Sequence, residues 1–309
     1  MYNADVPRGR SAQKKEGVAM AGTAKPLVKW VGGKRQLLGE IRKNMPEKFG
    51  TYFEPFFGGG AVFFDLMPKS AVINDYNTQL MNLYQQIQTD ADELQEIMSL
   101  WTKEYNELEA VEAKDAYFYG KREEYNQCIK NNEFSVKSAA LFVFLNKASF
   151  NGVYRLNKSG LYNVPCAHRM TLNMPSDEDI KAAADALKSA VILHGDFENA
   201  CAAVQAGDFV FFDSPYYDTF DTYQAGGFSD EDHLRLFRLF QRLDKLGAYC
   251  MLTNSNCDYV KNLYKAYNIS VVDVKRMVNR DSSNRVGQEV IITNYIPFKE
   301  SISFFEEMD

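Results

Sequence analysis

Short apolar runs alternate along the chain with longer amphipathic stretches. The apolar runs have the length of buried strands, and they lie at 52–53, 71–73, 191–193, 209–212, 249–252 and 290–292. Apolar residues spaced three or four apart predict helices at 61–66 and 230–246, and a helical region from about 78 to 150. The stretch 151–175 follows neither period and is expected to be rich in loops. The succession of strand, glycine turn, helix and strand over 52–75 opens a βαβ unit, which predicts an α/β fold.

This pattern also predicts how the chain is divided. Residues 25–80 and 186–300 are expected to form one discontinuous α/β domain, and 81–185 a mostly helical insertion. Residues 1–24 mix Gly, Pro, Lys, Arg and Ser without periodicity, which predicts a flexible tail. Residues 301–309 are expected to form a second, acidic tail.

Composition excludes several classes of protein. Of the 309 residues, 46% are hydrophobic, which is enough for a large core and excludes a disordered chain. No stretch approaches the roughly 20 apolar residues of a membrane-spanning helix. The five cysteines are scattered without a CxxC pair, so we expect neither a disulfide framework nor a metal site, and a reducing cytoplasm fits best.

The net charge of −6 argues against a nucleic-acid partner, but it hides a local excess of positive charge. Between Lys137 and Arg169 there are five Lys or Arg residues and no Asp or Glu. Local potential, rather than total charge, guides binding to a polyanion. The insertion is therefore a candidate nucleic-acid surface, and a solvated basic loop is the alternative.

Glycines follow the first predicted strand, where a backbone can approach a ligand closely. Gly58 and Gly60 stand in this turn, but Phe63 occupies the third glycine position of a dinucleotide fingerprint, which disfavours NAD or FAD. Asp75 ends the next strand and is suited to accept hydrogen bonds from ribose hydroxyls. The alternative role of Asp75 is that of a helix N-cap.

The segment Asp213-Ser214-Pro215-Tyr216 follows the apolar run at 209–212 and suits methylation of an exocyclic amine. The lone pair of such an amine is delocalised into its ring, and two acceptors on its hydrogens draw the pair out of conjugation. The carboxylate of Asp213 and the backbone carbonyl of Ser214 are candidates for these acceptors. Pro215 stiffens the turn, and Tyr216 offers a face on which a base can stack. A polar turn with a packed tyrosine is the alternative.

Taken in order, several segments resemble one family, the Dam-type (D12 class) DNA adenine-N6 methyltransferases. The resemblance covers about Lys25 to Tyr295, and its motifs are KWVGGK at 29–34, EPFFGGG at 54–60, NDYN at 74–77, GDF at 195–197, DSPY at 213–216, GFS at 227–229, LTNS at 252–255 and the segment 284–295. It implies a Rossmann-like S-adenosylmethionine-dependent methyltransferase sheet with a DNA-recognition insertion. It also implies the cytoplasm of a bacterial or phage-infected cell. One departure is Ser214, which replaces the first proline of the family's DPPY element.

The resemblance implies a role for each matched position. Residues expected to bind S-adenosyl-L-methionine are Trp30, Lys34, Glu54, Pro55, Phe56, Gly58, Gly60, Asp75, Asp196, Phe197 and Asp213. Among them, Lys34 is expected near the methionine carboxylate, and Asp196 and Phe197 at the cofactor adenine. The alternatives are that Trp30 and Phe197 are core aromatics, Lys34 a solvated lysine and Asp196 a helix cap.

Basic, amide and aromatic side chains interleave in the insertion between 146 and 165, a segment that resembles the family's recognition hairpin. Residues expected to bind DNA are Lys29, Lys147, Phe150, Asn151, Val153, Arg155, Lys158 and Pro165. Lysines neutralise phosphates, and Arg155 can grip a guanine edge. Phe150 and Val153 can wedge into the gap that a flipped base leaves. By the same resemblance, Lys29, Arg155 and Pro165 are candidates for reading a GATC-like site.

The hypothesis is direct methyl transfer from S-adenosylmethionine to a flipped adenine in double-stranded DNA, without a metal or a covalent enzyme intermediate. Two alternatives stay open: a methyltransferase that acts on RNA or a protein glutamine, and a DNA-binding homologue with little activity because of Ser214. The sequence identifies no partner restriction nuclease.

Overall fold

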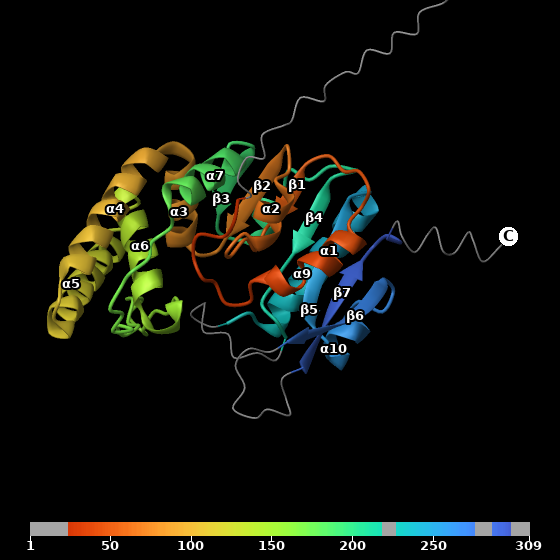
Figure 1. Cartoon of the computed structure of the whole chain (residues 1–309). Helices are drawn as coiled ribbons and strands as arrows, with labels where there is room; N and C mark the ends of the chain where they lie inside the picture. The colour runs from red at the N-terminus through yellow and green to blue at the C-terminus, as the bar shows by residue number, and fades with distance from the viewer. Residues whose placement is uncertain (1–23, 218–226, 276–285, 298–309) are drawn as a thin grey trace, which may run out of the picture.

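The computed structural model describes residues 24–217, 227–275 and 286–297 (Figure 1). The two predicted tails, 1–24 and 301–309, lie outside these residues except for Ala24. Residues 284–285 of the carboxyl-terminal motif also lie outside them.

Seven strands of the described chain form one sheet in the order β3-β2-β1-β4-β5-β7-β6. Their bounds are β1 (Tyr52–Glu54), β2 (Ala71–Asp75), β3 (Ala190–His194), β4 (Phe209–Phe212), β5 (Tyr249–Ser255), β6 (Asn268–Lys275) and β7 (Val286–Thr293). β7 runs antiparallel to both of its neighbours, whereas the pairs from β3 to β5 are parallel. The predicted α/β fold with a Rossmann-like sheet is confirmed. β6 was not predicted.

Both faces of the sheet are buried, as the apolar run of β4 shows. Phe209 and Phe211 join one apolar cluster, while Val210 and Phe212 join the cluster on the opposite face. Alternate residues of a strand point to opposite faces, so a strand covered on both sides reads as a continuous apolar run.

The second face is covered by α9 (Asp230–Leu246), which has the predicted bounds. Ser229 caps its first turn in a capping box with Asp232, and Gly247 ends it in the left-handed conformation. The remaining elements outside the insertion are η1 (Lys34–Gln36), α1 (Leu38–Asn44), α2 (Ala61–Leu66), α8 (Phe197–Ala200) and α10 (Asp258–Leu263).

The insertion is mostly helical, as predicted. Its elements are α3 (Thr78–Thr89), α4 (Ala91–Glu107), α5 (Val111–Lys130), α6 (Val136–Ala148), η2 (Phe150–Gly152) and α7 (Asp177–Leu187). Helices α4, α5 and α6 gather beyond the β3 edge of the sheet (Figure 1). α6 is buried along most of its length, and its apolar residues belong to the same cluster as Tyr52, Ile73 and Phe209 of the sheet. The helices of the insertion therefore share one core with a face of the sheet.

In the part of the chain that the structure describes, no helix combines the length and the apolar character needed to cross a membrane.

Candidate functional site

A cavity of about 580 Å³ opens at the carboxyl ends of β1 and β4. From β1 the chain adds β2 and β3 toward one edge of the sheet, and from β4 it adds β5 toward the other edge. The cavity therefore lies at a topological switch point, where open α/β sheets bind ligands. Its walls include the predicted segments around 30–34, 54–60 and 213–216. The volume falls in the usual range of small-molecule sites, roughly 300–1,000 Å³.

The glycine turn after β1 brings its backbone against Trp30. Gly58 and Gly60 both have a positive φ, at 50° and 68°. A Cβ atom on Gly58 would lie 2.7 Å from Cδ1 of Trp30, so a larger residue there would displace the indole ring. The wall that Trp30 contributes therefore depends on this glycine.

Asp75 holds the same turn from the end of β2. Its Oδ2 accepts a hydrogen bond from the N–H of Gly58 at 2.8 Å, and its Oδ1 accepts one from the N–H of Asn77 at 2.9 Å. The N-cap of α3 is Asn77, whose side chain accepts from Leu80, so the interpretation of Asp75 as the helix cap is wrong. Asp75 lines the cavity, and burial raises its pKa.

Glu54 contributes a buried carboxyl group at the end of β1. Its Oε2 accepts a hydrogen bond from the hydroxyl of Tyr52 at 2.8 Å. Burial raises the pKa of Glu54 well above its ordinary value, and the nearby carboxylate of Asp213 acts in the same direction. The neutral form of Glu54 is therefore favoured beside Asp213.

Asp213 lines the cavity directly after β4 and is held by two donors. Nζ of Lys34 lies 2.5 Å from its Oδ1, and the hydroxyl of Thr253 donates to the same oxygen at 3.0 Å. Burial raises the pKa of Asp213, while Lys34 and Thr253 lower it. Lys34 is itself buried, so its interpretation as a solvated lysine is wrong. Its contact with Asp213 was not predicted.

Ser214 and Tyr216 are held by residues of β5 and β7. Nδ2 of Asn254 donates to Oγ of the buried Ser214 at 3.3 Å. The hydroxyl of Tyr216 donates to Glu289 on β7, and the ammonium of Lys34 lies 4.7 Å from the centre of the tyrosine ring. Burial together with the charges of Asp213 and Glu289 raises the pKa of Tyr216, so the phenol stays protonated.

Asp196 and Phe197 are not among the described residues that line this cavity. Asp196 caps α8 by accepting from the N–H of Glu198 at 2.9 Å, and it pairs with Arg235 at 2.8 Å. The helix-cap interpretation of Asp196 is thus confirmed. Phe197 is buried and stacks on Phe56, a cavity residue, with ring centres 5.2 Å apart.

The predicted hairpin folds back on itself through antiparallel contacts. Bridges join Ser149 to Cys166 and Leu156 to Tyr162. Of the eight residues proposed to bind DNA, Lys147 and Val153 are half-buried, and the exposed ones are Lys29, Phe150, Asn151, Arg155, Lys158 and Pro165. The hairpin therefore presents basic and aromatic side chains to solvent from one compact loop.

Positive charge also gathers where the hairpin meets the amino-terminal segment. Burial, followed by the neighbouring cations Lys29 and Arg35, lowers the pKa of Lys147. Within the insertion, Nε of Arg155 donates to Oδ1 of Asn163 at 2.8 Å across the hairpin, which holds the guanidinium at its surface. Such a group of cations is suited to phosphates.

Asn146, which sequence reasoning did not select, joins the hairpin to the amino-terminal segment. Its Oδ1 accepts from the N–H of Lys29 at 2.8 Å, and its Nδ2 donates to the carbonyls of Lys29 and Gly152, each at 2.9 Å. The amide is buried, so it has exchanged water for these three bonds. Thr253, Asn254 and Glu289 were missed as well. All lie in segments that carry the resemblance, but no local signal indicates their contacts.

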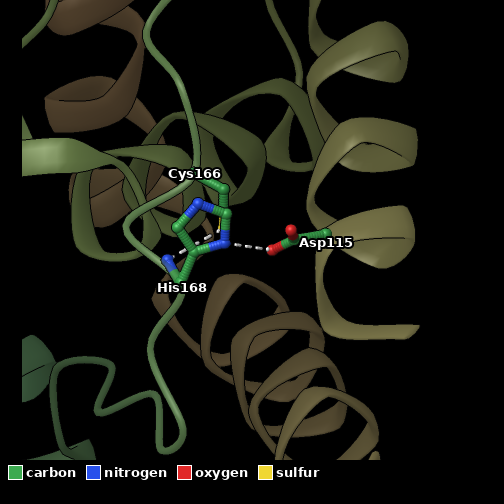
Figure 2. A group of neighbouring side chains, drawn as sticks. All are labelled: Asp115, Cys166 and His168. Atoms are coloured by element: carbon green, nitrogen blue, oxygen red, sulfur yellow. Dashed lines mark hydrogen bonds and ion pairs between the residues drawn. The ribbon is translucent and has the colours of Figure 1, made fainter. Parts of the chain in front are cut away.

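A separate polar group lies on the insertion and consists of Asp115, Cys166 and His168 (Figure 2). Nδ1 of His168 lies 2.9 Å from Oδ1 of Asp115, and the backbone N–H of His168 donates to Sγ of Cys166 at 3.3 Å. A tetrahedral zinc ion between an imidazole and a carboxylate would hold these ligand atoms about 3.3 Å apart. The shorter contact is that of a direct hydrogen bond, which fastens the segment after the hairpin to α5.

Comparisons with known proteins agree with this geometry. Residues 30–278 match the family model of the D12 class N6 adenine-specific DNA methyltransferases. The chain is 37% identical over 280 residues to the type II methyltransferase M1.LlaDCHI of Lactococcus lactis subsp. cremoris, covering 88% of this chain and 95% of that protein. It is 38% identical to the type II methyltransferase M.MjaIII of Methanocaldococcus jannaschii, with 88% and 99% covered. It is 27% identical to the retron Ec67 DNA adenine methylase of Escherichia coli, with 82% and 85% covered.

Proposed function

The chain belongs to the D12 class N6 adenine-specific DNA methyltransferases. We propose that the cavity is the active site in which it methylates adenine. The methyl group comes from S-adenosyl-L-methionine in the cavity, and the acceptor is N6 of an adenine rotated out of duplex DNA. The observation that carries this proposal is the meeting of Asp213, Ser214 and Tyr216 with the glycine turn in one cavity at the switch point.

The cavity residues fit S-adenosylmethionine in shape and charge. The absence of a Cβ atom at Gly58 and Gly60 lets Trp30 and Phe57 pack directly against this turn, and both rings line the cavity. Asp75 lines the cavity beside this turn, and its carboxylate is proposed to accept the ribose hydroxyls, while Trp30 and Phe56 offer apolar walls. The carboxylates of Asp75 and Asp213 also attract a sulfonium cation.

When bound, S-adenosylmethionine supplies a methyl group on a positively charged sulfur, which leaves as a neutral thioether. Asp213 and the carbonyl of Ser214 accept the two hydrogens of the target amine and thereby free its lone pair for attack on the methyl carbon. With the methyl donor bound, the new C–N bond would replace the C–S bond, and the carboxylate of Asp213 would take the proton that the nitrogen loses and pass it to solvent. Holding the reactants in line is the main source of rate in such a transfer.

Ser214 is compatible with this mechanism, although the family element has proline there. The proposed contact uses the backbone carbonyl, and the hydrogen bond from Asn254 to the Ser214 hydroxyl restrains the turn in a way that proline cannot. This observation favours an active enzyme over a DNA-binding homologue without activity.

The flipped adenine is proposed to stack on Tyr216, and the exposed hairpin is proposed to read a GATC-like site. Burial and the bond to Glu289 restrain the tyrosine ring. Lys29, Arg155 and Pro165 are the proposed site-reading residues, with Phe150 and Val153 as the wedge. The basic hairpin and the absence of acids from 137 to 169 favour DNA over a protein glutamine as the substrate.

The test is sequencing that detects methylated adenine in unmodified duplex DNA after incubation with the protein and S-adenosylmethionine. We expect N6-methyladenine at one short motif, and Asp213→Ala should abolish methylation while binding of the same duplex stays within about twofold. Methylation of RNA or protein alone, or none at all, would refute the proposed function. N6-methyladenine at an unrelated motif would refute only the GATC-like site.

A further inference from the structure

Thr253 lies beside Asp213 because their strands are neighbours in the sheet. β4 and β5 are parallel, with Phe212 paired to Leu252, so the residue after each pair comes to the same edge of the cavity. Thr253 is completely buried, and its hydroxyl donates to Oδ1 of Asp213 at 3.0 Å. The hydroxyl of Thr253 is thus directed at the carboxylate of the catalytic segment.

The two oxygens of Asp213 have different surroundings. Oδ1 accepts from Thr253 and lies 2.5 Å from Nζ of Lys34. Oδ2 has no hydrogen bond to any residue that the structure describes. A carboxylate held at one oxygen by two donors has a fixed rotation and presents its other oxygen to the site.

We propose that Thr253 is a positioning residue for methyl transfer, which turns the Asp213 carboxylate so that Oδ2 receives the hydrogen of the target amine. This inference deepens the proposed function and rests on it. Lys34 neutralises the charge of the carboxylate, whereas Thr253 fixes its orientation. A hydroxyl on a β-branched side chain within a strand has few allowed rotations, so it donates in one direction. Packing alone does not call for a hydroxyl at this position, because valine has nearly the same shape.

Two substitutions separate the hydroxyl from the shape of the side chain. Thr253→Val keeps the branched shape and removes the donor, whereas Thr253→Ser keeps the donor and removes a methyl group. Thr293→Val is the matched control, since Thr293 is a buried threonine of β7 whose hydroxyl donates to the backbone carbonyl of Tyr295 at 2.8 Å instead. All three proteins are first compared with the wild type by thermal unfolding.

We expect Thr253→Val to lower kcat about 10- to 100-fold with little change in KM for DNA or S-adenosylmethionine, because hydrogen bonds to charged groups are among the stronger ones. The acid limb of its kcat against pH profile should move to higher pH, since Asp213 loses a donor that favours its ionised form. Thr253→Ser should recover most of the activity and the wild-type profile, and Thr293→Val should change neither.

A wild-type kcat and acid limb in Thr253→Val would overturn the inference. A loss of kcat without a shift of the acid limb, or an equal loss in Thr293→Val, would also overturn it, because the hydroxyl would then act only through packing. If the wild-type protein transfers no methyl group to adenine, the proposed function itself fails and this inference fails with it, so the two failures are distinguishable.

Discussion

Replacing Asn146 by alanine should separate the hairpin from the amino-terminal segment that lines the cavity. The side chain makes three hydrogen bonds, two with the backbone of Lys29 and one with that of Gly152, and it is buried. Each bond contributes about 0.5–1.5 kcal/mol net, so the loss of all three should lower the free energy of unfolding by about 1.5–4.5 kcal/mol. Natural domains are typically stable by about 5–15 kcal/mol, so this is a large fraction of the total.

Urea denaturation of Asn146→Ala and of the wild type measures this difference directly. The control is Asn131→Ala, which removes the same atoms from the exposed end of α5. Because the described residues form no hydrogen bond with the Asn131 side chain, this change should alter the free energy of unfolding by less than about 0.5 kcal/mol. DNA affinity should fall in Asn146→Ala only, because Lys29 and the hairpin lose their fixed spacing. A loss below about 1 kcal/mol, or equal losses in both variants, would show that the buried amide does not hold these segments together.

Three further predictions concern the cavity and the hairpin. Arg155→Ala should reduce discrimination between matched and mismatched sites by about 1–3 kcal/mol, measured as the ratio of kcat/KM values, and an unchanged ratio would remove its role in reading bases. Gly58→Ala should lower Tm, because a left-handed backbone costs alanine about 1–2 kcal/mol. It should also raise KM for S-adenosylmethionine, because the new Cβ atom would lie 2.7 Å from Trp30, and wild-type values would contradict this close approach. Burial raises the pKa of Glu54 above its unfolded value near 4.5, so its stabilising contribution is complete below pH 4.5 and is lost as pH rises through the folded-state pKa. Glu54→Gln should therefore raise Tm more at pH 8 than at pH 5, and equal changes at both would count against a buried carboxyl.

The periodic parts of the fold were predictable because local sequence determines them. The bounds of α2 and α9 follow from apolar spacing and from the cap residues Ser229 and Gly247. β6 was not predicted, although 268–275 is rich in β-branched residues. β6 pairs only with β7, and β7 lies between β6 and β5 in the sheet although it comes last in the chain. The insertion of β7 between β5 and β6 is a long-range property that no local pattern conveys.

The candidate site was predictable as a set of segments but not as a set of contacts. Asp213, the turn at Gly58 and Asp75 meet because parallel strands end at one edge of the sheet. The ion pair between Lys34 and Asp213 and the bond from Tyr216 to Glu289 join residues far apart in the chain. Such pairings depend on side-chain geometry across strands, which residue types and spacing do not specify.

The shared core of sheet and insertion limits how this protein can change in evolution. Helix α6 packs in the same apolar cluster as strand residues such as Tyr52 and Ile73, so exchanging the helices would require rebuilding one whole face of the sheet. The exposed side chains of the hairpin, such as Phe150 and Arg155, are not packed in this core, so they can be replaced without rebuilding it. With the role proposed for the hairpin, substitutions at this tip would change the DNA target while the core that supports the cavity is inherited unchanged.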